Sequence, residues 1–391
     1  MHKLSRIPAV LLRRFSEAKL ARKLPQQRAL WESDIAALPP ACPLDGTVAL
    51  VRLDDIGDYL LWRNCLPAYR AFFAGRPLIL IGNKVWQPLF ETLDAACADR
   101  FIPLDKGRYL NDAAYRNAFW AGIRAAGIEQ IICPSRTRPL LLDDCIALAS
   151  GAPVRIAVQN NFPFASWNRI SDAVYTRLLP GQEGTHEFYF NRWFTECITG
   201  PVTSLPARMS LPVAGEPQPR RIVCFIGASA KSKRWPAGYW IALVRLLSQA
   251  GFEPVLSGGP AESELAATIS AAVPVTNLTA TGSLIQTLEL IAGSGALITG
   301  DTMAAHAGVG LSVPTIIIAN GVNAARFVAY GEAGIQGVST LYTEAYRNAS
   351  PARRKRFTAV TKDMLSIRPE QVMQALLSLL THTRSDVQDP A

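Results

Sequence analysis

Short apolar runs rich in β-branched residues alternate with segments of helical length along the whole chain. In its first half these runs are 47–53, 77–81, 130–133 and 154–158. Runs of about four to eight such residues, bounded by turn residues, are typical of buried strands. Alternation of buried strand and helix predicts an α/β architecture, with a parallel sheet covered by helices on both faces.

A second series of the same kind follows. Its predicted strands are 221–226, 254–257, 296–299 and 314–318, and its predicted helices are 237–250, 261–271, 283–292 and 302–309. Residues 201–220, between the two series, hold five prolines, which is typical of a linker. The pattern therefore predicts two Rossmann-like, doubly wound domains, 47–200 and 221–380, that face a central cleft. We expect residues 381–391 to form a flexible tail.

Composition adds limits to this picture. The chain of 391 residues is 49% hydrophobic and 18% charged, enough for sizeable cores, and no apolar stretch approaches the roughly 20 residues of a membrane-spanning helix. Its seven cysteines are scattered and include no Cys-x-x-Cys pair. This spacing favours neither a disulfide framework nor a zinc site. We expect a soluble protein of a reducing, cytoplasmic compartment, without a bound metal.

Positive charge is concentrated before residue 47. Residues 1–30 carry eight lysines and arginines against Glu17, and so supply most of the net charge of +9. Apolar residues at helical spacing among them predict a basic amphipathic extension, 1–46, whose residues 1–30 bind an anionic membrane surface. Packing of this helix on the neighbouring domain is the alternative. The rest of the chain shows no basic stripe, which disfavours nucleic acid as a partner.

The first strand runs into an acidic turn that holds Asp54, Asp55, Gly57 and Asp58, ahead of a helix expected to start near Tyr59. Ligands of open α/β sheets lie beyond the carboxyl ends of the strands. Three acids disfavour a phosphate there, so one of them is a candidate general base. Helix capping by Asp55 or Asp58 is the alternative. We expect Gly57 to let the chain turn closely.

The first turn of the second domain, 227–236, has the opposite character. It combines small residues with the hydroxyl of Ser229 and the charges of Lys231 and Lys233, just before Pro236, where a helix is expected to begin. This composition suits the binding of a diphosphate, although a solvated basic turn is the alternative. The spacing is not that of a Walker loop.

Two further strand ends of the second domain carry candidate residues. Gly258 and Gly259 are followed by Glu262 and Glu264, either of which could hold the hydroxyls of a ribose or simply favour a helix start. The third strand is followed by Asp301, by Thr302 and, five positions after Asp301, by His306. A lone histidine on an apolar helix is more often a core residue, but this one shares a helix end with an aspartate at the expected cleft.

Four of these segments together resemble glycosyltransferase family 9, the heptosyltransferase family of lipopolysaccharide biosynthesis. They are Val-x-Leu-x-x-Ile-Gly-Asp at 51–58, Lys-x-Trp-Pro at 233–236, Gly-Gly-x-x-Glu at 258–262, and Gly-Asp-Thr-x-x-x-His at 300–306. The resemblance extends over about residues 47–380. It implies the GT-B fold, a metal-independent inverting glycosyltransferase without a cofactor, and a nucleotide-sugar donor similar to ADP-heptose. It also implies an acceptor that is a lipopolysaccharide or a related cell-surface or lipid-linked glycan.

Carried over residue by residue, the resemblance implies a role for each motif. Asp58 matches the base that deprotonates the acceptor hydroxyl, Lys233 the lysine on the donor phosphates, and Asp301 the aspartate beside the donor sugar. The remaining donor residues implied are Ser229, Lys231, Glu262, Thr302 and His306. Asp55, Arg63 and Arg136 are candidate acceptor residues, because arginines could line an anionic acceptor site. The basic extension, the pair Asp54-Asp55 and the lysine-rich loop depart from the usual pattern.

The sequence thus predicts a cytoplasmic glycosyltransferase, peripheral on the inner face of the bacterial inner membrane. Two alternatives stay open. One is a sugar-nucleotide epimerase of GT-B fold. The other is an inactive family member that only binds a glycan or the membrane.

Overall fold

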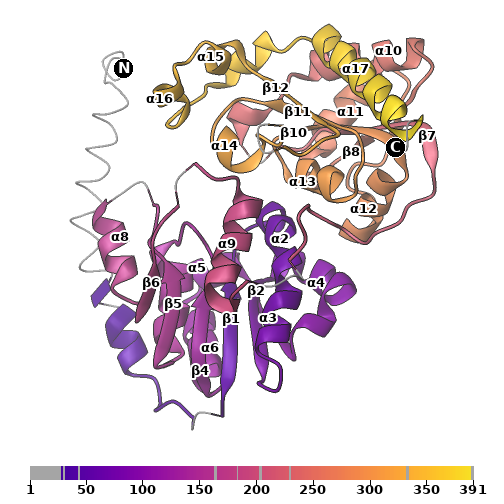
Figure 1. Cartoon of the computed structure of the whole chain (residues 1–391). Coiled ribbons are helices and arrows are strands. Elements are labelled where there is room, and N and C mark those ends of the chain that lie inside the picture. Colours follow the sequence, from indigo (N-terminus) through magenta and orange to yellow (C-terminus); the bar gives the residue numbers. More distant parts are fainter. Residues whose placement is uncertain are drawn as a thin grey trace, which may run out of the picture.

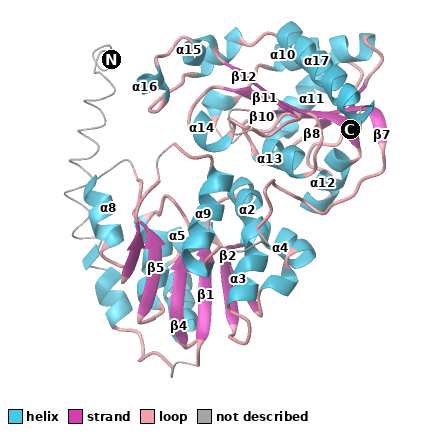
Figure 2. Ribbon diagram, viewed as in Figure 1, coloured by secondary structure: helices cyan, strands magenta, loops and turns pink. Residues whose placement is uncertain are grey.

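The computed structural model describes residues 28–29, 31–42, 45–162, 165–182, 184–201, 205–228, 230–331 and 334–388. They form two domains, each built around one parallel sheet (Figures 1 and 2). Residues 1–27, which carry most of the predicted membrane-binding segment, lie outside the described residues. The described part of the extension packs on the first domain, where Ile35 belongs to the core.

The first sheet has the strand order β3-β2-β1-β4-β5-β6, and all its pairings are parallel. Its strands are β1 (Thr47–Arg52), β2 (Leu78–Asn83), β3 (Arg100–Leu104), β4 (Ile128–Cys133), β5 (Val154–Val158) and β6 (Arg177–Leu179). The helices around it are α2 (Ile56–Trp62), α3 (Leu66–Phe72), α4 (Gln87–Leu93), α5 (Lys106–Asn111), α6 (Ala113–Arg124), α7 (Cys145–Ala149), α8 (Ala165–Asp172) and α9 (Glu187–Thr199).

The second sheet has the order β12-β11-β10-β7-β8-β9, again all parallel. Its strands are β7 (Gln218–Phe225), β8 (Glu253–Ser257), β9 (Thr276–Asn277), β10 (Ser294–Gly300), β11 (Thr315–Ala319) and β12 (Val338–Tyr342). Its helices are α10 (Ala237–Gln249), α11 (Ser263–Ala272), α12 (Leu284–Ala292), α13 (Met303–Gly310), α14 (Ala324–Phe327), α15 (Glu344–Arg347), α16 (Pro351–Arg354) and α17 (Pro369–Gln388). None of the helices within the described residues is long and apolar enough to cross a membrane.

All eight predicted strands are present, and four strands were missed. The missed strands are β3, β6, β9 and β12, which are the edge strands of the two sheets. Each lacks the run of three or more consecutive buried residues that every central strand has: both residues of β9 are exposed, and every residue of β12 is only partly buried. A strand covered on one side needs no uninterrupted apolar run, so the pattern used to find strands does not detect it.

Two predicted boundaries are wrong. β7 begins at Gln218, inside the predicted linker, because Gln218 pairs with Ser294 of β10. The backbones approach so closely there that a Cβ atom on Gly295 would lie 2.1 Å from the carbonyl oxygen of Pro219. At the other end of the chain, residues 381–388, expected in a flexible tail, continue helix α17.

The two domains meet at the ends where β1 and β10 finish. Helix α2 follows β1, helix α13 follows β10, and the two helices pack against each other. α12 packs on α4 beside them, and apolar side chains of both domains join one buried cluster. Figure 1 shows α2 and α9 on the side of the first domain that faces the second. The carboxyl ends of both sheets therefore face one interdomain region.

Candidate active site

Gly57 and His306 form a close contact between α2 and α13. A Cβ atom on Gly57 would lie 2.8 Å from Cδ2 of His306 and 3.5 Å from the Cα atom of Met303. Helix α2 begins at Ile56, earlier than expected, so Gly57 lies inside the helix and makes no turn. The predicted reason for this glycine is therefore wrong. Its missing side chain lets the two domains touch.

Asp58 is the next residue, in the first turn of α2, and its side chain is only partly exposed. Loss of solvation, together with the negative charges of Asp54 and Glu187, raises the pKa of Asp58 to about 7, against the opposing effect of Arg52 and Arg326. A carboxylate with a pKa close to neutral is well suited to take a proton in the reaction. Asp58 is thus a candidate general base by its pKa as well as by its motif.

The other two acids of this segment are bound in ion pairs. Asp54 lies 2.8 Å from Nε of Arg52, and Asp55 accepts a hydrogen bond of 2.9 Å from Nζ of Lys106. Asp55 occupies the N-cap position of α2 without a capping hydrogen bond from its side chain, and Asp58 lies within the helix. Helix capping therefore explains none of the three carboxylates. Asp55 is strongly exposed, at the rim of the site.

Beside Asp58 lies a cluster of three arginines around one buried glutamate, Glu187. Glu187, the first residue of α9, is fully buried. Its carboxylate lies 2.8 Å from Nε of Arg326, 3.5 Å from Nε of Arg136 and 3.8 Å from Nη2 of Arg52. Arg136 also donates to the carbonyl oxygen of Thr185, and burial lowers its pKa to about 10. The predicted acceptor residue Arg136 thus belongs to the surroundings of the candidate base.

Arg63, in contrast, has a structural role. Its guanidinium group is buried and binds both carboxylate oxygens of Asp94, at 2.9 and 2.7 Å. It also donates to the carbonyl oxygen of Ser210 in the segment that joins the domains. Because the group is buried and bound to these partners, the prediction that Arg63 contacts the acceptor is wrong. Trp62, which precedes it, is fully buried in the core.

On the second domain, Lys233 and Asp301 form an ion pair. The Nζ atom of Lys233 lies 2.7 Å from Oδ2 of Asp301, which is itself nearly buried. Thr302 caps α13 by accepting a hydrogen bond of 3.2 Å from the backbone N–H of Ala304. Lys231 is exposed on the short turn that also carries Lys233, and Ser229 lies outside the described residues. A lysine and a helix N-terminus thus meet at one point, a combination that attracts anions.

His306 is buried between the two domains. Its Nδ1 is hydrogen-bonded to the hydroxyl group of Tyr330. Burial, together with the charges of His186 and Lys233, lowers the pKa of His306 to about 3. The ring is therefore neutral at physiological pH. It packs against the base-bearing helix and is close enough to Lys233 to feel its charge, so it connects the two halves of the site.

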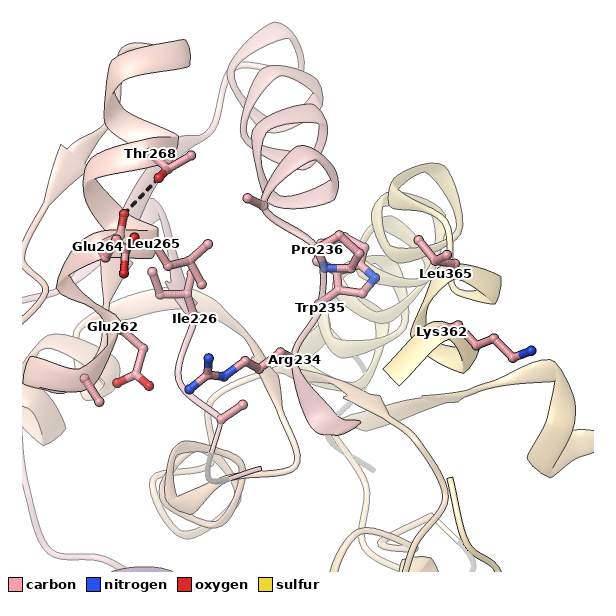
Figure 3. Close-up of a pocket in the computed structure, with 13 residues that line it drawn as sticks. Ile226, Arg234, Trp235, Pro236, Glu262, Glu264, Leu265, Thr268, Lys362 and Leu365 are labelled. Atoms are coloured by element: carbon pink, nitrogen blue, oxygen red, sulfur yellow. Dashed lines mark hydrogen bonds between the residues drawn. The ribbon is translucent and has the colours of Figure 1, made fainter. Parts of the chain in front are cut away.

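A cavity of about 700 Å³ opens in the second domain, next to the turn that carries Lys231 and Lys233. Its walls are mainly apolar and include Ile226, Trp235 and Leu265. Figure 3 shows the guanidinium group of Arg234 pointing across the cavity toward the carboxylate of Glu262. One oxygen of Glu262 accepts a hydrogen bond of 3.1 Å from the N–H of Gly259, which holds the side chain in place. The volume of the cavity, its apolar walls and its few charged groups are those of a small-molecule pocket.

The structure thus brings together residues that are far apart in the sequence. The contact of α2 with α13 places Asp58, His306, Asp301 and Lys233 at one interface. Sequence reasoning missed the partners of the base, which are Arg52, Glu187 and Arg326. Arg326 follows β11, so the rule that sites lie beyond the carboxyl ends of strands could have identified it. Within the described residues, no three histidine, cysteine or acidic side chains are grouped so as to hold a metal.

Comparison with known proteins agrees with this arrangement. Residues 207–349 match the family model of glycosyltransferase family 9 (heptosyltransferase). A search of curated proteins found no match to the chain. Among solved structures, the chain is similar to a glycosyl transferase of family 9 from Veillonella parvula DSM 2008. That alignment has a TM-score of 0.67 at 18% identity and covers 88% of this chain and 99% of the other.

Two heptosyltransferases of E. coli are also similar. ADP-heptose lps heptosyltransferase II aligns with a TM-score of 0.62 at 15% identity, over 86% of this chain and 99% of its own. Heptosyltransferase WaaC, solved with ADP, aligns with a TM-score of 0.63 at 16% identity, over 85% of this chain and 99% of its own. These alignments confirm the predicted GT-B fold over both domains. With the match of residues 207–349 to the family model, they confirm the resemblance to glycosyltransferase family 9 and support glycosyltransferase activity.

Proposed function

We propose that the protein transfers a sugar, with inversion and without a metal, from a nucleoside diphosphate sugar to a hydroxyl group of a cell-surface glycan. Heptose is the first candidate for the sugar, and a lipopolysaccharide precursor the first candidate for the acceptor. The observation that carries the proposal is the contact between α2 and α13. It sets the helix that carries Asp58, on one domain, against the helix that begins just after Asp301, the partner of Lys233, on the other.

In the proposed reaction, the carboxylate of Asp58 takes the proton of the acceptor hydroxyl as that oxygen attacks the anomeric carbon. The bond from the anomeric carbon to the diphosphate oxygen breaks, and the diphosphate leaves with its electron pair. Attack opposite the leaving group inverts the anomeric centre. Lys233 and the N-terminal end of α13 stabilise the charge that develops on the diphosphate. Held in one cleft, the two substrates react with little loss of entropy at the reaction step.

The cavity next to turn 227–236 would hold the nucleoside part of the donor. Its apolar walls suit a base, and Glu262 is our candidate for the ribose hydroxyls, through the carboxylate oxygen that the Gly259 N–H does not occupy. WaaC was solved with ADP and with ADP-2-deoxy-2-fluoro heptose, which supports an adenosine diphosphate sugar as the first donor to test. We place Asp55 and Arg136 on the acceptor side, where Arg136 would favour an anionic glycan.

We further propose that the protein works on the inner face of the bacterial inner membrane, where a lipid-linked acceptor would be exposed. Residues 1–30 are the first candidate for the contact. A second basic surface lies on the described part of the chain, at α16 and the residues after it, where Arg353, Arg354, Lys355 and Arg356 are all exposed. Figure 1 shows α16 at the edge of the second domain. Clustered cations of this kind attract anionic lipids.

A panel of nucleotide sugars tests the proposal. Wild-type protein and the variant Asp58→Asn should both gain thermal stability with the correct donor, but only wild type should transfer the sugar to a glycan acceptor. Product formed without an acceptor would instead indicate an epimerase. Stabilisation without turnover by wild type would indicate an inactive binding protein. Equal transfer rates for wild type and Asp58→Asn would refute Asp58 as the base.

A further inference from the structure

Arg326 of the second domain is bound by two residues of the first. Its Nε and Nη2 atoms donate to the two carboxylate oxygens of Glu187, at 2.8 and 3.2 Å, and Nη1 donates to Oγ1 of Thr137 at 3.2 Å. Bidentate pairs of arginine and carboxylate are geometrically specific, and they are stronger than neutral hydrogen bonds. Three of the five N–H donors on this guanidinium group are thereby used to join the domains.

The same segment makes a second connection across the interface. The carbonyl oxygen of Phe327, beside Arg326, lies 3.3 Å from Nε2 of His186, the N-cap residue of α9. Tyr330, three residues further, binds Nδ1 of His306, which packs on Gly57. The segment 326–330 therefore touches the first domain at α9 and, through His306, supports the contact with the helix that carries Asp58.

The charges that face Asp58 come from several elements. Asp54 lies on the segment before α2, Arg52 on β1 and Glu187 on α9, while Arg326 is on α14. His306, on α13, is neutral. Among the charges named here, Arg326 alone belongs to the second domain. The electrostatic surroundings of the candidate base are therefore completed only when the two domains are closed on each other.

We propose that Arg326 is a positioning residue that, by binding Glu187 across the cleft, holds the closed arrangement of the domains in which Asp58 acts as the base. The inference rests on the proposed function, because it concerns the same reaction. Its physical basis is the full burial of Glu187: without Arg326, this carboxylate loses its closest partner while still out of contact with water.

The test compares Arg326→Gln and Glu187→Gln with Arg326→Lys, which keeps the charge but not the bidentate geometry. Arg220→Gln is the matched control, because Arg220 forms an exposed ion pair with Glu253 inside one domain. The full chain is examined by small-angle X-ray scattering without substrate. The pH dependence of kcat is then measured with saturating donor and acceptor, so that it reports the bound complex.

We expect Arg326→Gln and Glu187→Gln to increase the radius of gyration and Arg220→Gln to leave it unchanged. Both cleft variants should lower kcat at neutral pH by about tenfold or more, as expected when reacting groups are misplaced. The acid limb of the profile should move to higher pH in Arg326→Gln, which loses a cation, and to lower pH in Glu187→Gln, which loses an anion. Arg326→Lys should keep the acid limb of wild type.

The outcomes separate this inference from the proposed function. If wild type transfers no sugar, the proposed function fails, and scattering alone decides whether Arg326 holds the domains together. If wild type is active and both cleft variants keep its radius of gyration, rate and acid limb, the inference is wrong. A lower rate with an unmoved acid limb and an unchanged radius in both variants would also overturn it, because it would reduce the pair to a local structural role.

Discussion

At the scale of single residues, the surroundings of a side chain decide what its chemistry can do. The three carboxylates at the end of β1 are alike in the sequence, yet Asp54 and Asp55 are bound by Arg52 and Lys106. Asp58 remains, with a pKa raised to about 7 by lost solvation and neighbouring negative charge. The motif identified the candidate base together with two nearby charges, Asp54 and Arg52, but the other two charges that shift its pKa, Glu187 and Arg326, come from α9 and α14, which no local pattern connects to it.

The raised pKa predicts how activity depends on pH. Asp58 must be deprotonated to accept a proton, so kcat/KM should rise as pH increases through about 7 and level off above it. Rates measured from about pH 5.5 to 9 would show this limb, and Asp58→Asn should lack it. An acid limb at about pH 4, the ordinary range of a carboxyl group, would contradict the assignment.

Lys233 allows a second prediction at this scale. Lys233→Ala removes the partner of the nearly buried Asp301 and a positive charge at the proposed phosphate site. Donor affinity should fall by about tenfold to a hundredfold, or ~1.4 to ~2.8 kcal/mol, with a smaller loss for Lys233→Arg. Titration calorimetry with the nucleoside diphosphate would measure it. Lys84→Ala, at an exposed site of the first domain, is the control and should bind as wild type does.

At the scale of elements, the packing of α2 on α13 is the contact on which the site depends. Periodicity predicted both helices but not their meeting, because an amphipathic pattern gives the buried face of a helix and not the element that covers it. The meeting needs a residue without a side chain at Gly57, since His306 and Met303 fill the space where a Cβ atom would lie.

Gly57→Ala should therefore push the two helices apart. An overlap at 2.8 Å in packed surroundings is expected to cost about 1–3 kcal/mol. We expect a lower melting temperature and reduced transfer activity. Gly238→Ala is a close control, because Gly238 is likewise the second residue of a helix and a Cβ atom there meets nothing within 4 Å. The control should be neutral or slightly stabilising. Equal behaviour of the two variants would show that the close contact is unimportant.

At the scale of the whole molecule, two sheets and the segment between them create the cleft. That segment is bound to both domains: the carbonyl oxygen of Ser210 accepts hydrogen bonds from Arg63 and Asn64 of the first domain, and the backbone N–H of Leu211 donates to the carbonyl oxygen of Gly310 in the second.

The basic surface around α16 and the basic residues 1–30 give the chain two positively charged regions.

Removal of residues 1–27 tests which region binds a membrane. The truncated chain should no longer sediment with phosphatidylglycerol vesicles, because most of the charge excess of the extension is lost, and it should keep its activity on a soluble acceptor. Vesicles of phosphatidylcholine are the control and should bind neither form. Full retention on anionic vesicles would assign membrane binding to the surface at α16 instead.

Patterns along the chain were enough to identify the two series of central strands, the carboxyl ends at which ligands would lie, and the motifs that carry Asp58, Lys233, Asp301 and His306. These are local features: an apolar run, a turn, or a helix start depends on residues close together in the chain. The sequence pattern could not reveal the edge strands, because partial burial leaves no continuous apolar run.

Which residues surround the candidate base follows from the packing of the folded chain. Arg52, Glu187 and Arg326 are separated by more than a hundred positions, and they meet because three elements converge at the interdomain interface. Packing likewise excludes Arg63 as an acceptor residue, because its guanidinium group is bound to Asp94. It also makes Gly57 a contact point between the domains, because His306 packs against it. Burial, ion pairing and pKa depend on what packs against a residue in space, and a pattern along the chain does not contain that information.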